Sequence, residues 1–180
     1  MTAFELQILD SLQTIHTPVL DRIMIGFSRL EDYGLIWIIL DVILLLIPRT
    51  RTAGKVLLLG ILLEAVGVNL ILKPLVARTR PYEVNPAAEL ITREMWDYSF
   101  PSGHTAIAFT AVTVLYLTKM KPLWQIALPV ACLIAFSRMY LYVHFPTDVA
   151  AGVILGILFG VLGFRLEEWI TKRQADTKQT

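Results

Sequence analysis

Long apolar stretches are the feature of this sequence that most restricts its fold. A helix needs about 20 residues to cross the roughly 30 Å hydrocarbon core of a bilayer, and fewer where neighbouring helices cover its polar ends. Five stretches satisfy this condition, and we accept the last of them despite Asp41: Lys55–Lys73, His104–Thr118, Leu123–Val143, Asp148–Phe164 and Tyr33–Ile47. The pattern predicts an all-α integral membrane protein.

The composition agrees with this prediction. Hydrophobic residues make up 56% of the chain, charged residues 17%, and the mean hydropathy is +0.62, whereas a soluble domain is about 45–50% apolar. The net charge of +1 argues against a nucleic-acid partner, which would favour a strongly basic surface. The single cysteine, Cys132, has no partner for an intramolecular disulfide. Met1–Glu5 lacks the positive region of a cleavable signal peptide.

The N-terminal segment has a different character. Its apolar side chains recur at helical spacing, at Phe4, Ile8, Leu12 and Ile15. Its polar side chains, which include Glu5, Asp10 and Gln13, fall on other faces. This pattern predicts an interfacial helix. The following segment, Val19–Leu30, is either a sixth span or none, because it contains Asp21, Arg22 and Arg29.

We therefore predict a single domain built as a bundle of five to six transmembrane helices. Residues 1–31 form its N-terminal segment, residues 33–168 its helical core and residues 169–180 a solvated tail. No repeat or low-complexity tract interrupts this organisation. The sequence does not determine the oligomeric state.

Basic residues in the loops predict the orientation in the membrane. Three segments share one side of the predicted bundle and carry Arg49, Arg51 and Lys55, then Lys119 and Lys121, then Lys172, Arg173 and Lys178. The positive-inside rule makes that side, and with it the C-terminus, cytoplasmic. The segment Pro74–Pro101 and the turn around His144 then lie on the extracytoplasmic side.

Charged and titratable residues gather at this extracytoplasmic side. Lys73 ends one apolar stretch, and Arg80-Pro81 follows seven residues later. Seven residues are nearly two helical turns, so both cations point the same way if the helix continues to Pro81, although Pro74 disturbs it. Arg78 would lie about 140° round from Lys73 on that helix, so we leave it out of the site. The alternative for Lys73 is a side chain that extends to the interface.

The tetrapeptide Pro101-Ser102-Gly103-His104 precedes the next span. Proline suits the first turn of a helix, and free N–H groups at a helix start attract anions. His104 would lie beside such an anion. An ordinary helix start is the alternative interpretation.

Arg138, His144 and Asp148 form the third group. Asp148 follows His144 by one helical turn, so its carboxylate can accept the imidazole Nδ1–H and leave Nε2 as a nucleophile. A capping aspartate and an interfacial arginine are the alternatives. Charged groups beside lipid are costly, and their conjunction here favours a functional site for a phosphate.

The three segments resemble the signature motifs of the type 2 phosphatidic acid phosphatase superfamily, which includes vanadium haloperoxidases and glucose-6-phosphatase. The matching patterns are Lys73-x6-Arg80-Pro81, Pro101-Ser102-Gly103-His104 and Ser137-Arg138-x5-His144-x3-Asp148. The resemblance implies a core of about six helices and a phosphatase that uses neither a metal nor another cofactor. A haloperoxidase of the soluble type disagrees with the apolar spans.

The resemblance also implies a role for each residue. His144 attacks phosphorus and forms a phosphohistidine, Asp148 orients it, and His104 acts as acid and then as base. Five groups would hold the phosphate oxygens, namely Lys73, Arg80, Ser102, Gly103 and Arg138. Two histidines that start in opposite protonation states predict a bell-shaped pH–rate profile.

A membrane lipid phosphate is the expected substrate, because the predicted site opens beside the bilayer in a chain without a soluble domain. Undecaprenyl diphosphate is the first hypothesis, and phosphatidylglycerol phosphate or phosphatidate is the alternative. Trp96, Tyr98 and Phe100 would form a hydrophobic lip or an interfacial anchor.

A non-catalytic channel or transporter is the remaining hypothesis. It would use intramembrane polar residues, namely Asp41, Glu64 and Asn69. Such residues can equally bond neighbouring helices, and Asn69 lies four residues before Lys73.

Overall fold

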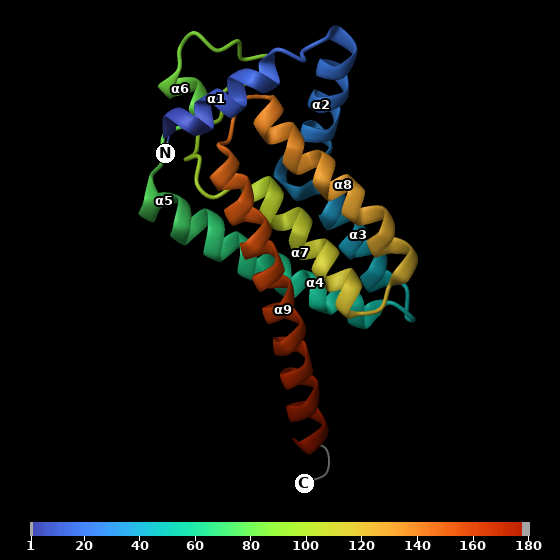
Figure 1. The fold of residues 1–180 in the computed structure, drawn as a ribbon. Coiled ribbons are helices and arrows are strands. Elements are labelled where there is room, and N and C mark those ends of the chain that lie inside the picture. Colours follow the sequence, from blue (N-terminus) through green and yellow to red (C-terminus); the bar gives the residue numbers. More distant parts are fainter. Residues whose placement is uncertain (1, 178–180) are drawn as a thin grey trace.

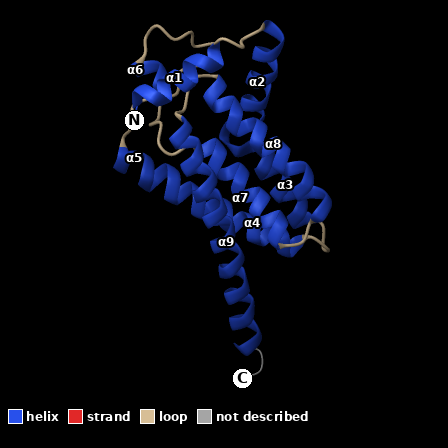
Figure 2. Ribbon diagram, viewed as in Figure 1, coloured by secondary structure: helices blue, strands red, loops and turns tan. Residues whose placement is uncertain are grey.

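The computed structural model describes residues 2–177, and all regular secondary structure in that range is helical. Figures 1 and 2 show the helices gathered into one bundle, from which the C-terminal part of the last helix projects. The helices are α1 (Thr2–Gln13), α2 (Pro18–Leu30), η1 (Asp32–Gly34), α3 (Leu35–Leu46), α4 (Arg51–Glu64), η2 (Ala65–Leu72), α5 (Lys73–Val76), α6 (Pro81–Val84), α7 (Gly103–Leu117), α8 (Lys121–Tyr140) and α9 (Pro146–Thr177). The all-α prediction is confirmed.

Helix α7 lies at the centre of the bundle and contacts α4, α8 and α9. Its side chains Ala106, Ala111, Val114 and Leu115 are buried. Four glycines of α9 recur on one face, at Gly152, Gly156, Gly160 and Gly163. At Gly152 an added Cβ would lie 2.8 Å from the backbone oxygen of Ser102. Glycine therefore allows α9 to approach the start of α7 closely.

The apolar helices of the bundle differ in length. Within the described residues, three helical segments are long and apolar enough to cross a membrane, namely Arg51–Val84, Lys121–Tyr140 and Pro146–Thr177. Helix α7 is apolar but has 15 residues. Helices α2 and α3 have 13 and 12 residues, which correspond to about 20 Å of helix at 1.5 Å per residue. The predicted total of five to six spans therefore stays a prediction.

The N-terminal helix forms as predicted, but one polar residue has a different place. Helix α1 lies across one end of the bundle beside α6 (Figure 1). Glu5 was expected to lie away from the packed face, yet only 4% of it is exposed, and Leu9 beside it is fully buried. The expected apolar face is partly open instead, because Phe4 is 67% exposed. The reason is that Glu5 has ionic partners inside the fold.

Two helix ends differ from the sequence prediction. The helix that carries Lys73 does not continue to Pro81: it ends at Val76, and Ala77 adopts a left-handed conformation with φ of +46°. At the C-terminus, α9 continues past Glu168 to Thr177, so the predicted tail is largely helical. Its exposed Trp169 packs under Arg173. Lys178, expected in that tail, lies outside the described residues.

Candidate active site

A cavity of about 700 Å³ opens where the three predicted motifs converge. Six of the eight predicted site residues line it, namely Lys73, Arg80, Gly103, His104, Arg138 and His144. The other two, Ser102 and Asp148, are fully buried next to these residues. Thus residues more than 70 positions apart in the sequence meet at one site.

His144 occupies the buried end of the cavity, where 1% of it is exposed. Nη1 of Arg80 lies 3.4 Å from its Nε2. Arginine has no acceptor, so Nε2 must be the acceptor and the neutral ring carries its proton on Nδ1. Burial lowers the pKa of His144 well below its usual value, and the cations of Arg80 and Arg138 lower it further. The imidazole is therefore neutral, with a lone pair on Nε2.

Asp148 lies beside the other ring nitrogen but is held mainly by other groups. Its Oδ2 is 3.7 Å from Nδ1 of His144, longer than a hydrogen bond. The same oxygen accepts the Ser99 hydroxyl at 2.5 Å and the Phe145 N–H at 2.9 Å. The other oxygen, Oδ1, accepts Nη1 of Arg78 at 2.5 Å. The carboxylate is thus fixed in place next to the imidazole.

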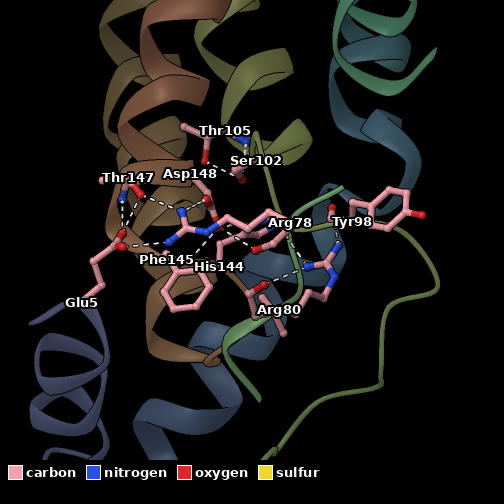
Figure 3. A network of polar contacts seen from close by, with 12 residues as sticks. Glu5, Arg78, Arg80, Tyr98, Ser102, Thr105, His144, Phe145, Thr147 and Asp148 are labelled. Atoms are coloured by element: carbon pink, nitrogen blue, oxygen red, sulfur yellow. Dashed lines mark hydrogen bonds and ion pairs between the residues drawn. The ribbon is translucent and has the colours of Figure 1, made fainter. Parts of the chain in front are cut away.

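Arg78, which the sequence analysis left out of the phosphate site, does not line the cavity but binds the carboxylate of Asp148. Figure 3 shows it between Asp148 and Glu5, in a network that also contains Thr147. Its Nη2 donates to Glu5 at 2.7 Å, and its guanidinium carbon lies 3.9 Å from the centre of the Phe145 ring. The helical-wheel argument failed because the helix ends before Arg78. In an irregular, extended segment, residues two apart can share a side, and Arg78 and Arg80 both reach the His144–Asp148 pair.

Asp97 is a second functional residue that the sequence analysis missed. Its carboxylate forms ion pairs with Lys73 and, at 2.5 Å, with Nη2 of Arg80. Burial opposes ionisation, but these two cations lower the pKa of Asp97 to about 2. Asp97 therefore forms ion pairs with two of the three cations assigned to the phosphate, and its charge offsets one of their two positive charges. The signal in the sequence is its position five residues before Ser102, in the loop that leads into the second motif.

Arg138 contributes the third cation from the end of α8. It is fully buried, and its Nη1 donates to the Ser28 hydroxyl of α2. Glu31, at the end of α2, is also fully buried beside the cavity. Burial raises the pKa of Glu31, and the opposing charge of Arg138 does not cancel this effect. The short helix α2, whose span was in doubt, thus helps to position a predicted phosphate ligand.

The start of α7 positions the second motif. Helix α7 begins at Gly103, with Ser102 as its N-cap, so Pro101 precedes the helix and is not in its first turn as predicted. The Ser102 hydroxyl accepts the Thr105 hydroxyl at 3.0 Å, and its N–H donates to the backbone oxygen of Asp148 at 3.1 Å. A Cβ on Gly103 would lie 3.8 Å from Nζ of Lys73. Gly103 therefore keeps the cavity open beside that lysine.

His104 faces the outer part of the cavity. Its Nε2 lies 3.9 Å from Oδ1 of Asp32, and 21% of its side chain is exposed. The pKa of Asp32 is lowered, mainly by His104 and, against the effect of burial, by Arg93. His104, at the start of α7, and His144, in the turn between α8 and α9, thus line the same cavity.

A π-helical segment places Lys73. Residues Ala65–Leu72 form η2, which ends directly before Lys73. Pro74 has no N–H for a regular helical hydrogen bond, and π-helical turns commonly accompany such irregularities at functional sites. Asn69 of this segment lines the cavity, and its Oδ1 would lie 3.3 Å from a Cβ on Gly103. Glu64 lines the same cavity, so two of the three residues of the transport hypothesis belong to this site.

The family model of the PAP2 superfamily matches residues 54–172. Undecaprenyl-diphosphatase of Sulfolobus acidocaldarius is 32% identical over 167 residues, which cover 91% of this chain and 79% of that protein. The crystal structure of Aquifex aeolicus LpxE has a TM-score of 0.76 and 30% identity, covering 89% of this chain and 94% of that one. A transmembrane PAP2-type phosphatidylglycerolphosphate phosphatase from Bacillus subtilis has a TM-score of 0.73 and 27% identity, covering 95% and 86%.

The chain therefore belongs to the PAP2 superfamily, and the prediction from the three motifs is confirmed. It is a multi-pass integral membrane protein and a lipid phosphatase of the PAP2 type. The hypothesis of a non-catalytic channel or transporter is set aside by this membership.

Proposed function

We propose that this phosphatase hydrolyses undecaprenyl diphosphate to undecaprenyl phosphate and inorganic phosphate. The observation that carries the mechanism is the buried, neutral imidazole of His144, whose Nε2 faces Arg80 in a cavity lined with cations. These cations suit the terminal phosphate, and the cavity also has an apolar wall formed by Ile38, Ile61 and Ile107. That wall is suited to a lipid.

In the first step, Nε2 of His144 attacks the terminal phosphorus. The bond from phosphorus to the leaving oxygen breaks, and His104 gives that oxygen a proton. Lys73, Arg80 and Arg138, with the Gly103 N–H, hold the oxygens on which charge develops. The bound phosphate takes the place of the Asp97 carboxylate on Lys73 and Arg80. The Ser102 hydroxyl caps α7 by accepting from Thr105, and its own O–H can donate to a phosphate oxygen.

In the second step, His104 takes a proton from water, and the water oxygen attacks the phosphohistidine. The N–P bond breaks, inorganic phosphate leaves, and His144 returns to its neutral form. Asp148 stabilises the positive imidazole during both steps. The groups that act in both steps are side chains and the Gly103 N–H.

We further propose five to six spans, with the site on the extracytoplasmic side and the C-terminus in the cytoplasm. The basic loops support this orientation. Trp96 is 92% exposed and Tyr98 46% exposed, and both line the cavity. Exposed aromatic side chains beside the cavity are suited to the headgroup layer, where a lipid phosphate would enter.

The substrate is supported by similarity to the undecaprenyl-diphosphatase of Sulfolobus acidocaldarius. The alternative, phosphatidylglycerol phosphate or phosphatidate, is supported by the similarity to the Bacillus subtilis phosphatase. The motifs do not separate these substrates, because they contact only the phosphate that is transferred.

The test measures phosphate release by purified protein in detergent with EDTA. We compare three substrates at equal concentration, namely undecaprenyl diphosphate, phosphatidylglycerol phosphate and phosphatidate. The controls are His144→Ala and Arg165→Ala, a substitution at an exposed residue outside the cavity. We expect undecaprenyl diphosphate to have the highest kcat/KM, and His144→Ala to lower it by at least about 10⁴-fold, as loss of a nucleophile does. Phosphate release that persists in His144→Ala would contradict the mechanism. A higher kcat/KM with another lipid would make that lipid the assigned substrate.

A further inference from the structure

One cation of the cavity is not used by any of the three motifs. Among the described residues, four lysines and arginines line the cavity, and three of them are the phosphate ligands Lys73, Arg80 and Arg138. The fourth is Arg93, in the loop between α6 and α7. Its side chain is 56% exposed, whereas the other three are buried. Arg93 therefore lies at the mouth of the cavity and not at its buried end.

The structure holds Arg93 next to His104. Nη2 of Arg93 lies 3.0 Å from Oδ1 of Asp32, and Nε2 of His104 lies 3.9 Å from the same oxygen. The guanidinium carbon of Arg93 also lies 5.9 Å from the centre of the Tyr33 ring. Asp32 and Tyr33 belong to the short η1 helix, so one corner of the backbone places Arg93 and the carboxylate that faces His104.

The chemistry of the leaving oxygen indicates which part of a substrate would lie beside Arg93. His104 protonates the oxygen that leaves phosphorus, so this oxygen must lie beside His104. In a diphosphate the oxygen is bonded to a second phosphorus, whereas in a monoester it is bonded to carbon. A second phosphate would thus lie next to His104, on the side away from His144. It brings negative charge there that a monoester does not have.

Arg93 has the capacity to bind that charge without leaving Asp32. Guanidinium has five N–H donors, and its ion pair with Asp32 is made through Nη2. The remaining donors are suited to phosphate oxygens in a bidentate geometry. Asp32 keeps the side chain in position, and the partial exposure of Arg93 leaves room for a lipid headgroup.

We propose that Arg93 forms a subsite for the second phosphate of a lipid diphosphate, the one directly bonded to the leaving oxygen. The inference rests on the proposed function and deepens it, because it makes Arg93 the residue that favours diphosphates over monoesters. Lys73, Arg80 and Arg138 bind the transferred phosphate of either substrate, whereas Arg93 meets only the second phosphate.

The experiment compares Arg93→Ala and Arg93→Lys with the wild type on undecaprenyl diphosphate and on phosphatidate. Arg165→Ala is the matched control, because Arg165 is also an exposed arginine in an ion pair, 3.4 Å from Glu168. We expect Arg93→Ala to lower kcat/KM for the diphosphate about tenfold, the loss typical of a charged hydrogen bond. We expect less than about a twofold change with phosphatidate, and partial recovery in Arg93→Lys. An equal loss with both substrates, or no loss with the diphosphate, would overturn the proposal.

A second measurement separates this proposal from the proposed function. Inorganic phosphate and pyrophosphate are compared as competitive inhibitors of whichever lipid the wild type hydrolyses. We expect pyrophosphate to bind more tightly than phosphate, and Arg93→Ala to remove most of this difference. If the wild type prefers a monoester but Arg93→Ala still weakens pyrophosphate selectively, the substrate assignment fails and the subsite stands. If Arg93→Ala weakens both inhibitors equally, the subsite is rejected whatever the substrate.

Discussion

At the scale of single residues, the site depends on carboxylates that balance its cations. Asp97 is paired with both Lys73 and Arg80, and Asp148 is paired with Arg78. Arg78 also forms an ion pair with Glu5 through its other terminal nitrogen. Buried charges are costly unless they are paired, and Asp97 supplies that pairing for Lys73 and Arg80 when phosphate is absent. The pairing explains why residues outside the three motifs lie within the site.

The pair of Arg78 and Asp148 leads to a pH prediction. In the wild type the lowered pKa of His144 keeps the imidazole neutral at pH values well below 6.5. Replacing Arg78 with methionine leaves the Asp148 charge without its arginine, and this charge then favours protonated His144. We expect the acid limb of kcat/KM to move to higher pH and kcat to fall about tenfold, while KM changes little because Arg78 does not line the cavity.

The measurement is the pH–rate profile of Arg78→Met and Arg78→Lys from pH 4 to 9. Arg78→Lys keeps the charge and should restore the wild-type limb, which a merely structural defect would not predict. An unchanged limb in Arg78→Met would contradict this role. The same lowered pKa affects stability: the unfolded chain binds the proton near pH 6.5 and the folded chain only at lower pH, so protonation favours unfolding below about pH 6.5.

At the scale of secondary-structure elements, helix ends and close helix contacts determine the geometry of the site. The helix that carries Lys73 ends at Val76 after a π-helical segment, which allows Arg80 to turn back towards Asp97. Helix α9 approaches the N-cap of α7 through Gly152. Both features position side chains that a continuous or more distant helix would not bring together.

The contact at Gly152 predicts a loss of stability and activity on substitution. A Cβ there would lie 2.8 Å from the Ser102 oxygen and 2.8 Å from the Thr105 Cβ, so α9 would have to move away from α7. We expect Gly152→Ala to lower the free energy of unfolding by about 1–3 kcal/mol, the typical cost of overpacking, and to reduce kcat.

Gly26→Ala is the matched control. It lies in α2, and nothing lies within 4 Å of its added Cβ. Alanine in a helix interior should leave the stability unchanged or raise it by up to about 1 kcal/mol. Thermal unfolding of both variants in detergent makes the comparison. Equal stability of Gly152→Ala and the wild type would show that the two helices can separate without cost.

At the scale of the whole molecule, the two N-terminal helices contribute to a site whose motifs come later in the chain. Helix α1 is attached through Glu5 to Arg78 and Thr147, and α2 through Ser28 to Arg138. In Figure 1 both helices lie at the end of the bundle away from the C-terminus. The N-terminal segment thus completes a site whose motifs lie between residues 73 and 148.

The proposed orientation predicts which side of the membrane is accessible to reagents. In a Cys132→Ala background, a cysteine in place of the exposed Trp96 should react with an impermeant maleimide on intact cells. A cysteine in place of Lys121, at the exposed start of α8, should react only after the cells are opened. Reaction of Lys121→Cys on intact cells would contradict the proposed orientation and indicate the opposite one.

The sequence by itself determined the class of this protein and predicted most residues of the candidate site. Apolar length and helical spacing predict membrane helices because these are local properties of the chain. The motif residues Lys73, Arg80, His104, Arg138 and His144 could be named because their chemistry and spacing are distinctive. All five line one cavity.

Only the tertiary structure decided which charges meet. Arg78, Asp97, Arg93 and Asp32 carry no local pattern, since an isolated charge in a loop is compatible with solvent, an interface or an ion pair. Their partners lie 17 to 73 residues away in the sequence, and the chain direction after Ala77 depends on a left-handed residue that helical spacing does not reveal. Electrostatic pairing acts through space over a few ångströms, so it is settled only when the helices have packed.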